Sequence, residues 1–213
     1  YLGLSGGQRD SHRVPGGARL DNTDWSREGI TGALGAELGP AGRLGLTLRS
    51  DGIYDAGFRG SSWSPGNRDD RSNASADLSL DGATGDGRFR WNLQGYLVRD
   101  EDEFRWLSPV VRNAAGLPAP GTSRDFNFRR LDIAGARLQP VVRLWAGAEA
   151  LVGLDVERSW LRSTRNRTNL PGGGTGQVAP QDNNQTDSNL GLYAEVSQRV
   201  LDDRLTLRAG VRQ

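Results

Sequence analysis

The residues from Val142 to Glu157, VRLWAGAEALVGLDVE, are apolar at every second position. Side chains alternate between the two faces of a β-strand, whereas a helix needs apolar residues at i, i+3 and i+4. The pattern therefore predicts one β-strand through the whole stretch. Strands of globular proteins usually end after about 5 or 6 residues, and a tilted transmembrane strand needs about 9 to 11. The length thus favours a transmembrane strand that continues beyond the hydrocarbon. Its apolar positions are Val142, Leu144, Ala146, Ala148, Ala150, Val152, Leu154 and Val156.

Other segments alternate in the same way and predict further strands of a sheet with one apolar face. They are residues 43–49, 73–81, 88–97, 190–197 and 205–212. Two more segments alternate less regularly. Residues 27–38 are interrupted by glycines, and residues 126–138 change face part-way, which predicts a β-bulge there.

The predicted strands are joined by short and long connections in strict alternation. Short turns are predicted at 39–42, 84–87, 139–141 and 202–203, where Gly, Pro and Asp gather. Long connections are predicted at about 8–26, 55–70, 99–125 and 163–187. An antiparallel meander with short turns on one side and long loops on the other is typical of outer-membrane barrels.

The composition agrees with a sheet that needs only one apolar face. Hydrophobic residues make up 35% of the 213 residues, and 30 residues are glycine. The formal net charge of +1 provides no strong field for nucleic acid, so no nucleic-acid partner is expected. The chain lacks cysteine, which excludes disulfides and thiolate metal sites. No stretch approaches 18 consecutive apolar residues, so no transmembrane helix is predicted.

These observations predict an all-β fold, an antiparallel up-and-down transmembrane β-barrel with short periplasmic turns and long extracellular loops. The even-numbered face of residues 142–156 would contact lipid, because charged side chains avoid hydrocarbon. The odd-numbered face would contact a wet or plugged lumen. The predicted lumen-facing residues are Arg143, Glu149, Asp155 and Glu157.

The long loops would gather a small-molecule ligand outside the membrane. Arginine side chains suit anionic chelates because their forked donors match carboxylate geometry, and tryptophan rings could contact a ligand or join an interfacial belt. The same loops also carry many acids, so the charge balance does not identify the solute. The predicted ligand-binding residues are Arg59, Trp63, Arg68, Arg105, Trp106 and Arg165.

Motifs for catalysis or metal binding are weak. Asp155 and Glu157 have a spacing close to that of glycosidase carboxylates, but solvated lumen acids partnered by arginines such as Arg143 are the simpler interpretation. His12 is the single histidine, and it lies in a polar segment. The sequence predicts no catalytic residue, no metal site, no cofactor and no enzymatic activity.

Three stretches resemble the barrels of TonB-dependent outer-membrane receptors. They are NLGLYAEVSQRVLDDRLTLRAGVR (189–212), LTLRSDGIYDAGF (46–58) and ASADLSLDGATGDGRFRWNLQGYLVRDEDEF (74–104). The resemblance implies a barrel of about 22 strands around a plug domain, in the outer membrane of a Gram-negative bacterium. It also implies uptake of a scarce solute, such as an iron–siderophore or cobalamin, driven by the TonB complex.

Under this hypothesis residues 1–213 are part of one β-barrel domain and hold about eight or nine of its strands. The plug, the signal peptide and the C-terminal strands would lie outside this chain, since no TonB box or plug motif occurs in it. Lipid and lipopolysaccharide, the protein's own plug, the TonB complex and a small-molecule ligand are the expected partners. Two alternatives remain open at this point: a passive porin-type channel and a soluble all-β binding or adhesion module.

Overall fold

The structure, a computed structural model, describes residues 1–39, 42–58, 66–107, 111–112, 118–119, 123–170, 173–180 and 182–213. The described residues form one large antiparallel sheet and a separate two-stranded ladder, and they contain no α-helix. None of the described elements is a helix long and apolar enough to span a membrane.

The large sheet has ten strands, of which nine follow one another as neighbours. These nine are β1 (Leu2–Arg9), β2 (Trp25–Glu37), β3 (Arg43–Gly57), β4 (Arg68–Ala83), β5 (Phe89–Leu107), β8 (Ser123–Trp145), β9 (Ala148–Asn169), β11 (Gln185–Val200) and β12 (Leu205–Arg212). The short β10 (Thr175–Val178) pairs with β9, and β6 (Val111–Arg112) pairs with β7 (Pro118–Ala119).

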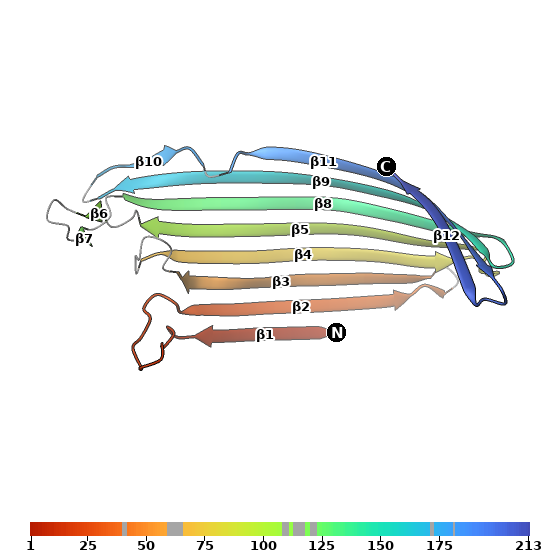
Figure 1. The fold of residues 1–213 in the computed structure, drawn as a ribbon, viewed down its shortest axis with the longest axis horizontal. Coiled ribbons are helices and arrows are strands. Elements are labelled where there is room, and N and C mark those ends of the chain that lie inside the picture. Colours follow the sequence, from red (N-terminus) through yellow and green to blue (C-terminus); the bar gives the residue numbers. More distant parts are fainter. Residues whose placement is uncertain are drawn as a thin grey trace.

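Short and long connections alternate along the chain as predicted, which places all of one kind at one end of the sheet (Figure 1). The strand ends joined by short connections, Glu37 to Arg43, Ala83 to Phe89, Trp145 to Ala148 and Val200 to Leu205, lie at what we call the turn end. The strand ends joined by long connections, Arg9 to Trp25, Gly57 to Arg68, Leu107 to Ser123 and Asn169 to Gln185, lie at the loop end. The path begins at β1 and ends at β12 without closing, so the sheet is open.

The strand registers bring most of the apolar residues in the half of the sheet nearer the turn end onto one face. Leu80, for example, pairs with Leu44 on one side and with Leu93 on the other, and Leu154 pairs with Leu138 and Leu192. We call these residues the apolar belt; it runs across all nine strands nearer the turn end. Its larger members include Leu4, Ile30, Leu34, Leu44, Leu46, Leu48, Leu78, Leu80, Phe89, Leu93, Leu97, Leu138, Val142, Val152, Leu154, Val156, Leu190, Leu192, Val196, Leu207 and Val211.

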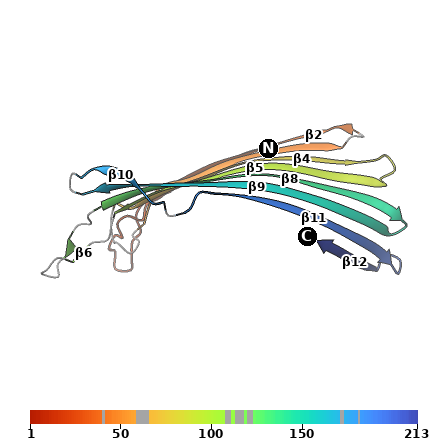
Figure 2. The ribbon, with the colours of Figure 1, turned by 90° about the horizontal axis from the view of Figure 1, so that it is seen from above.

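Nothing within the described chain covers the apolar belt. Ala148 is the one hydrophobic residue that is buried among the described residues, whereas belt residues such as Leu97 and Leu190 are 60% and 66% exposed. The accessible surface is 14335 Å² for 23.1 kDa, whereas a compact monomer of that mass exposes roughly 9,700 Å². Figure 2 shows the strands as one curved layer. The fold is therefore a sheet without a hydrophobic core of its own.

The prediction of one strand through residues 142–157 is wrong. β8 ends at Trp145, Ala146 and Gly147 form a tight turn, and β9 begins at Ala148. Gly147 has a φ of 77°, which a glycine adopts without steric cost. Val142 pairs with Ala150, so even-numbered residues face even-numbered residues along the hairpin, up to a register shift between Arg143 and Trp145 beside the turn. The alternation of apolar residues therefore continues unchanged through the turn.

The predicted turn at 139–141 is also wrong, because these residues lie inside β8. Pro140 pairs with Trp91 of β5, but Cα pairing with β9 is interrupted at Gln139 and Pro140 and resumes in the same register. The odd-numbered Arg143 donates its N–H to the carbonyl oxygen of Arg88, directly before β5, so the backbone nitrogen of the even-numbered position 140 points toward β9. Proline lacks the N–H that this side of the ladder would use. The missing donor explains the interruption.

Two further expectations need correction. Residues 126–138 contain no bulge, since their pairing with β5 runs without a register shift; Leu131 and Ile133 simply lie on the face opposite the belt. The strands also extend farther toward the loop end than predicted. Residues 99–103, expected at the root of a loop, are part of β5. The other short connections, at 38–42, 84–88 and 201–204, lie where the sequence placed them.

The β2–β3 turn requires glycine at position 42. Its φ is 112°, and a Cβ at this position would overlap the backbone carbonyl of Asp81. We expect Gly42→Ala to lower the free energy of unfolding by about 1 to 3 kcal/mol, measured by urea titration of the folded protein. Gly85→Ala, in the β4–β5 turn where a Cβ meets no atom within 4 Å, is the matched control. Equal effects of the two substitutions would contradict this account.

Candidate functional site

The face opposite the apolar belt, which we call the polar face, carries charged side chains along its whole length. Arg143, Glu149, Asp155 and Glu157 all lie on it, because they occupy odd-numbered positions of β8 and β9. Near the turn end, Arg90 forms an ion pair with Glu149 at 2.7 Å. Arg143 stands opposite Glu149 in the register.

Half-way along the strands, the polar face is held by two tyrosine–glycine pairs. Tyr96 pairs with Gly135 and Tyr193 pairs with Gly153, and in each case a Cβ on the glycine would overlap the tyrosine ring. The rings therefore lie flat across the neighbouring strand. Tyr96 donates its hydroxyl to Glu157 Oε2 at 2.6 Å.

Asp155 is the other acid of this middle cluster. It pairs with Arg137 at 2.7 Å and with Arg212 at 3.5 Å. Its arginine partners are therefore Arg137 and Arg212, and not Arg143, the partner that the sequence had suggested. A hollow of about 380 Å³ lies beside these residues.

The strongest concentration of charge lies on the polar face toward the loop end. Asp102 accepts a hydrogen bond from Arg129 at 3.0 Å and lies 3.9 Å from Arg71. Arg71 pairs with Asp69 at 2.9 Å, and Arg129 also reaches Asp182 at 3.6 Å. We call these five residues the upper cluster. Three of them, Arg71, Asp102 and Arg129, line a hollow of about 420 Å³ whose lining also includes Ser159 and Gln185.

The upper cluster brings two carboxyl groups into contact. Asp69 Oδ1 and Asp102 Oδ1 are both buried, and a hydrogen bond between the two carboxyl groups requires that they share a proton. Burial and the adjacent Asp102 carboxyl together raise the pKa of the Asp69 carboxyl to about 6, although Arg71 acts in the opposite direction. Asp69 lies well beyond the apolar belt on β4, whose belt residues begin at Ala74. No group of three or more His, Cys, Asp or Glu in the described part of the chain could hold a metal ion.

At the loop end itself, Asp125 holds two arginines in place. Its side chain is almost buried and accepts hydrogen bonds from Arg165 and from Arg167, the latter at 2.7 Å and 2.8 Å. The hydrogen bond from Arg167 holds the pKa of the Asp125 carboxyl below its ordinary value, with Arg165 adding to the effect. Both guanidinium groups are thus committed to a structural carboxylate.

The predicted ligand-binding residues do not form one surface. Arg105 pairs with Asp70 at 2.9 Å, and Arg68 pairs with Asp24 at 3.1 Å; both arginines lie on the same face as the apolar belt. Trp106 lies on the polar face, where its ring packs edge-on against Phe104 at 5.8 Å, and Arg165 also lies there. Arg59 and Trp63 are outside the described residues.

The upper cluster was not predicted from the sequence. Asp102 and Arg129 are paired in the register, and so are Arg71 and Asp102. The signal was present, because continuing the two-residue alternation of β4, β5 and β8 past the apolar residues places all three on the polar face. It was overlooked because residues 99–125 were predicted to be loop.

No protein-family model matches the chain, and no curated protein matches it. Among solved structures, the chain is similar to one titled "Copper transporter OprC", with a TM-score of 0.70 over 100% of this chain at 16% identity. The chain spans about a third of that structure, 32% of its length. The similarity confirms the predicted fold class, and the open sheet is consistent with part of a larger barrel.

The pKa of Asp69 predicts a pH dependence. A carboxyl whose pKa is raised on folding binds its proton more tightly in the folded state, so stability increases as pH falls from above 6 toward about 4. We expect Asp69→Asn to be more stable than wild type at pH 7.5, with the difference shrinking to nothing near pH 4, measured by urea unfolding. Asp102→Asn should weaken the pH dependence of wild type, because it removes the neighbouring acid. Asp77→Asn, on the same face of β4, controls for loss of a charge. A constant difference between Asp69→Asn and wild type at all pH values would contradict the assignment.

Proposed function

We propose that residues 1–213 are part of the barrel of a bacterial outer-membrane transporter of the TonB-dependent receptor type. The observation that carries the proposal is the apolar belt, which crosses all nine neighbouring strands on one face and is left uncovered by the residues that the structure describes. An outward apolar band with a polar interior is the arrangement of transmembrane barrels. The loop end would face outward and the turn end would face the periplasm, since long loops are extracellular in such barrels.

The open edges support the proposal that this is one portion of one barrel domain. β1 and β12 each have a single neighbour among the described strands. Unpaired backbone groups are not tolerated in hydrocarbon, so both edges would pair with strands from outside these residues. A signal peptide and a plug domain that contacts TonB would likewise be supplied from outside them. The lumen-facing residues Arg143, Glu149, Asp155 and Glu157 would then contact the plug or the solvent around it.

The upper cluster is the part of the polar face best suited to receive a solute. It combines the forked donors of Arg71 and Arg129 with the carboxylate of Asp102 beside a hollow. Such a site suits a polar chelate that carries both acceptors and donors. An iron–siderophore or a cobalamin fits this description. The similar solved structure is titled a copper transporter, but this chain offers no Met or Cys and only one His, and those are ligands that copper favours.

The placement of the belt in lipid is tested by two adjacent residues on opposite faces. Val152 is an exposed belt residue near the middle of the band, and Leu151 lies on the polar face. In the full-length protein folded into lipid vesicles, we expect Val152→Arg to cost about 2 to 4 kcal/mol. Leu151→Arg should cost clearly less. Similar costs for both, or full-length protein that stays soluble without detergent, would favour a soluble all-β module instead.

The solute site is tested by uptake. We expect Arg129→Ala to weaken binding of the transported chelate by about tenfold, because a charged hydrogen-bonding group is lost. Whole-cell uptake of a radiolabelled ferric siderophore, of cobalamin and of cupric ion, each assayed separately, provides the measurement. Arg49→Ala, on the polar face of β3 but away from the upper cluster, is the control. Uptake that is independent of TonB would support a passive channel.

A further inference from the structure

The two acids of the upper cluster that touch each other also touch arginines. Asp69 Oδ2 accepts a hydrogen bond from Arg71 Nε at 2.9 Å, and Asp102 Oδ2 accepts one from Arg129 at 3.0 Å. The buried Oδ1 atoms are therefore the ones left for the hydrogen bond between the two carboxyl groups. A carboxylate is only an acceptor, so one shared proton must supply the donor of that bond.

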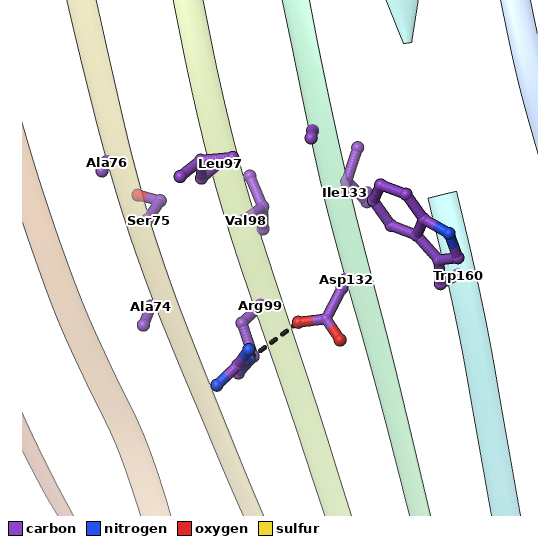
Figure 3. Close-up of a pocket in the computed structure, with 10 residues that line it drawn as sticks. Ala74, Ser75, Ala76, Leu97, Val98, Arg99, Asp132, Ile133 and Trp160 are labelled. Atoms are coloured by element: carbon purple, nitrogen blue, oxygen red, sulfur yellow. Dashed lines mark hydrogen bonds and ion pairs between the residues drawn. The ribbon is translucent and has the colours of Figure 1, made fainter. Parts of the chain in front are cut away.

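An acid on the opposite face of the sheet shows a different arrangement. Asp132 of β8 accepts a hydrogen bond from Arg99 on one oxygen at 2.7 Å and from Arg130 on the other at 2.8 Å. Figure 3 shows the first of these pairs, which joins β5 to β8. Each oxygen of Asp132 has a positive partner, so this carboxylate needs no proton. The contact between Asp69 and Asp102 therefore differs from the acid–arginine pairs elsewhere on the sheet.

Aromatic rings stand beside the two acids on their loop-end side. Phe104 is opposite Asp69 in the register, and its ring stacks on Phe58 at 5.3 Å and meets Trp106 edge-on at 5.8 Å. The side chains of Asp69 and Asp102 are only 19% and 21% exposed. Burial disfavours the charged form of a carboxyl group, so these surroundings help the two acids to keep their proton.

Loss of the shared proton would place two negative charges in contact. Among the described residues, the ion pairs of Asp69 and Asp102 involve only Arg71 and Arg129. Arg71 already lies 3.9 Å from Asp102 Oδ1, and its side chain is 66% exposed, so it has room to move. Because an arginine fork can pair with two acceptors at once, Arg71 would relieve the repulsion by bridging both carboxylates.

The other charges around the two acids are mostly negative. Arg129 is shared with Asp182 at 3.6 Å, and Asp100 of β5 accepts a hydrogen bond from Asn73 at 2.9 Å. On β9 the nearby lining of the hollow is uncharged. An anionic group that enters the hollow therefore depends on Arg71 and Arg129 for positive charge. The charged residues farther along the polar face are Arg27 of β2, Asp51 of β3 and Asp187 of β11.

We propose that the shared proton controls the solute site: while Asp69 and Asp102 hold it, Arg71 is free to bind an anionic group in the hollow, and when it is lost the two carboxylates retain Arg71. The inference rests on the proposed function, because it takes the upper cluster as the site that receives solute. The protonated state is also more positive by one charge, so an anionic solute binds more tightly at acidic pH. The pKa of about 6 for Asp69 places the change between about pH 5 and pH 7.5.

The test measures binding to the full-length protein in detergent by equilibrium dialysis at pH 5 and pH 7.5. The probe is the Co(III)–EDTA anion, and the tris(ethylenediamine)cobalt(III) cation is its comparison, since both are inert chelates that do not titrate in this range. We expect the anion to bind wild type about tenfold more tightly at pH 5 than at pH 7.5. The cation should show no gain at pH 5.

Four variants assign the effect to named residues. Asp69→Asn removes the titrating carboxyl and keeps its shape, so it should bind the anion equally at both pH values, with an affinity near that of wild type at pH 5. Asp102→Asn repeats this test in case Asp69→Asn fails to fold. Arg71→Gln should lose most of the binding at pH 5. Asp132→Asn, on the opposite face, is the matched control and should keep the tenfold pH dependence of wild type.

Three results would overturn the proposal: equal affinity of wild type for the anion at both pH values, no binding of the anion at pH 5, or a pH dependence that persists in Asp69→Asn. Failure of the proposed function gives a different result. If only the shared proton is wrong, full-length protein still inserts into vesicles and Val152→Arg remains costly. If the membrane placement is wrong, the protein is soluble without detergent at either pH.

Discussion

The whole structure depends on one constraint, an apolar face that the chain itself does not bury. A sheet normally covers its apolar face with a helix layer or a second sheet, but the described residues supply neither. Burial of apolar surface contributes about 25 cal/mol per Å², so leaving a belt of this size in water would forfeit a large part of the stabilisation available on folding. The belt therefore requires an apolar environment, and the continuity of this band across nine strands is what a membrane requires.

The same constraint divides each strand into two parts. Near the turn end, one face is apolar and the other is polar. Within each strand, charged side chains therefore occupy every second position, on the polar face. Toward the loop end, both faces carry charges, and stability comes from ion pairs such as Arg105–Asp70 on the belt side and Arg129–Asp102 on the polar side. Exposed pairs of this kind each contribute about 0 to 1 kcal/mol. Their main effect is to fix the positions of side chains.

Several errors of the sequence analysis share a physical origin. The turn at Ala146–Gly147 was invisible to periodicity because Val142 faces Ala150, and an even-to-even register carries the alternation through the hairpin unchanged. Pro140 suggested a turn, yet one missing donor is absorbed by an interruption of the ladder on the β9 side. The charges at 99–103 suggested a loop, since charged runs usually are solvated. These residues are also solvated as part of β5, because both faces of the sheet are polar in the half nearer the loop end.

The sequence by itself determined the fold class, the two faces of the sheet and the alternation of short and long connections, because each follows from local periodicity and turn chemistry. It also placed Arg143, Glu149, Asp155 and Glu157 on the polar face, since parity within a strand assigns a face. Only the tertiary structure decided where β8 ends, that Asp155 pairs with Arg137 and Arg212, and that Asp69, Arg71, Asp102 and Arg129 meet. Those contacts depend on the register between strands distant in sequence, and period-two alternation is unchanged when a strand slides by two residues. The register selects which charges become neighbours, and the alternation alone cannot.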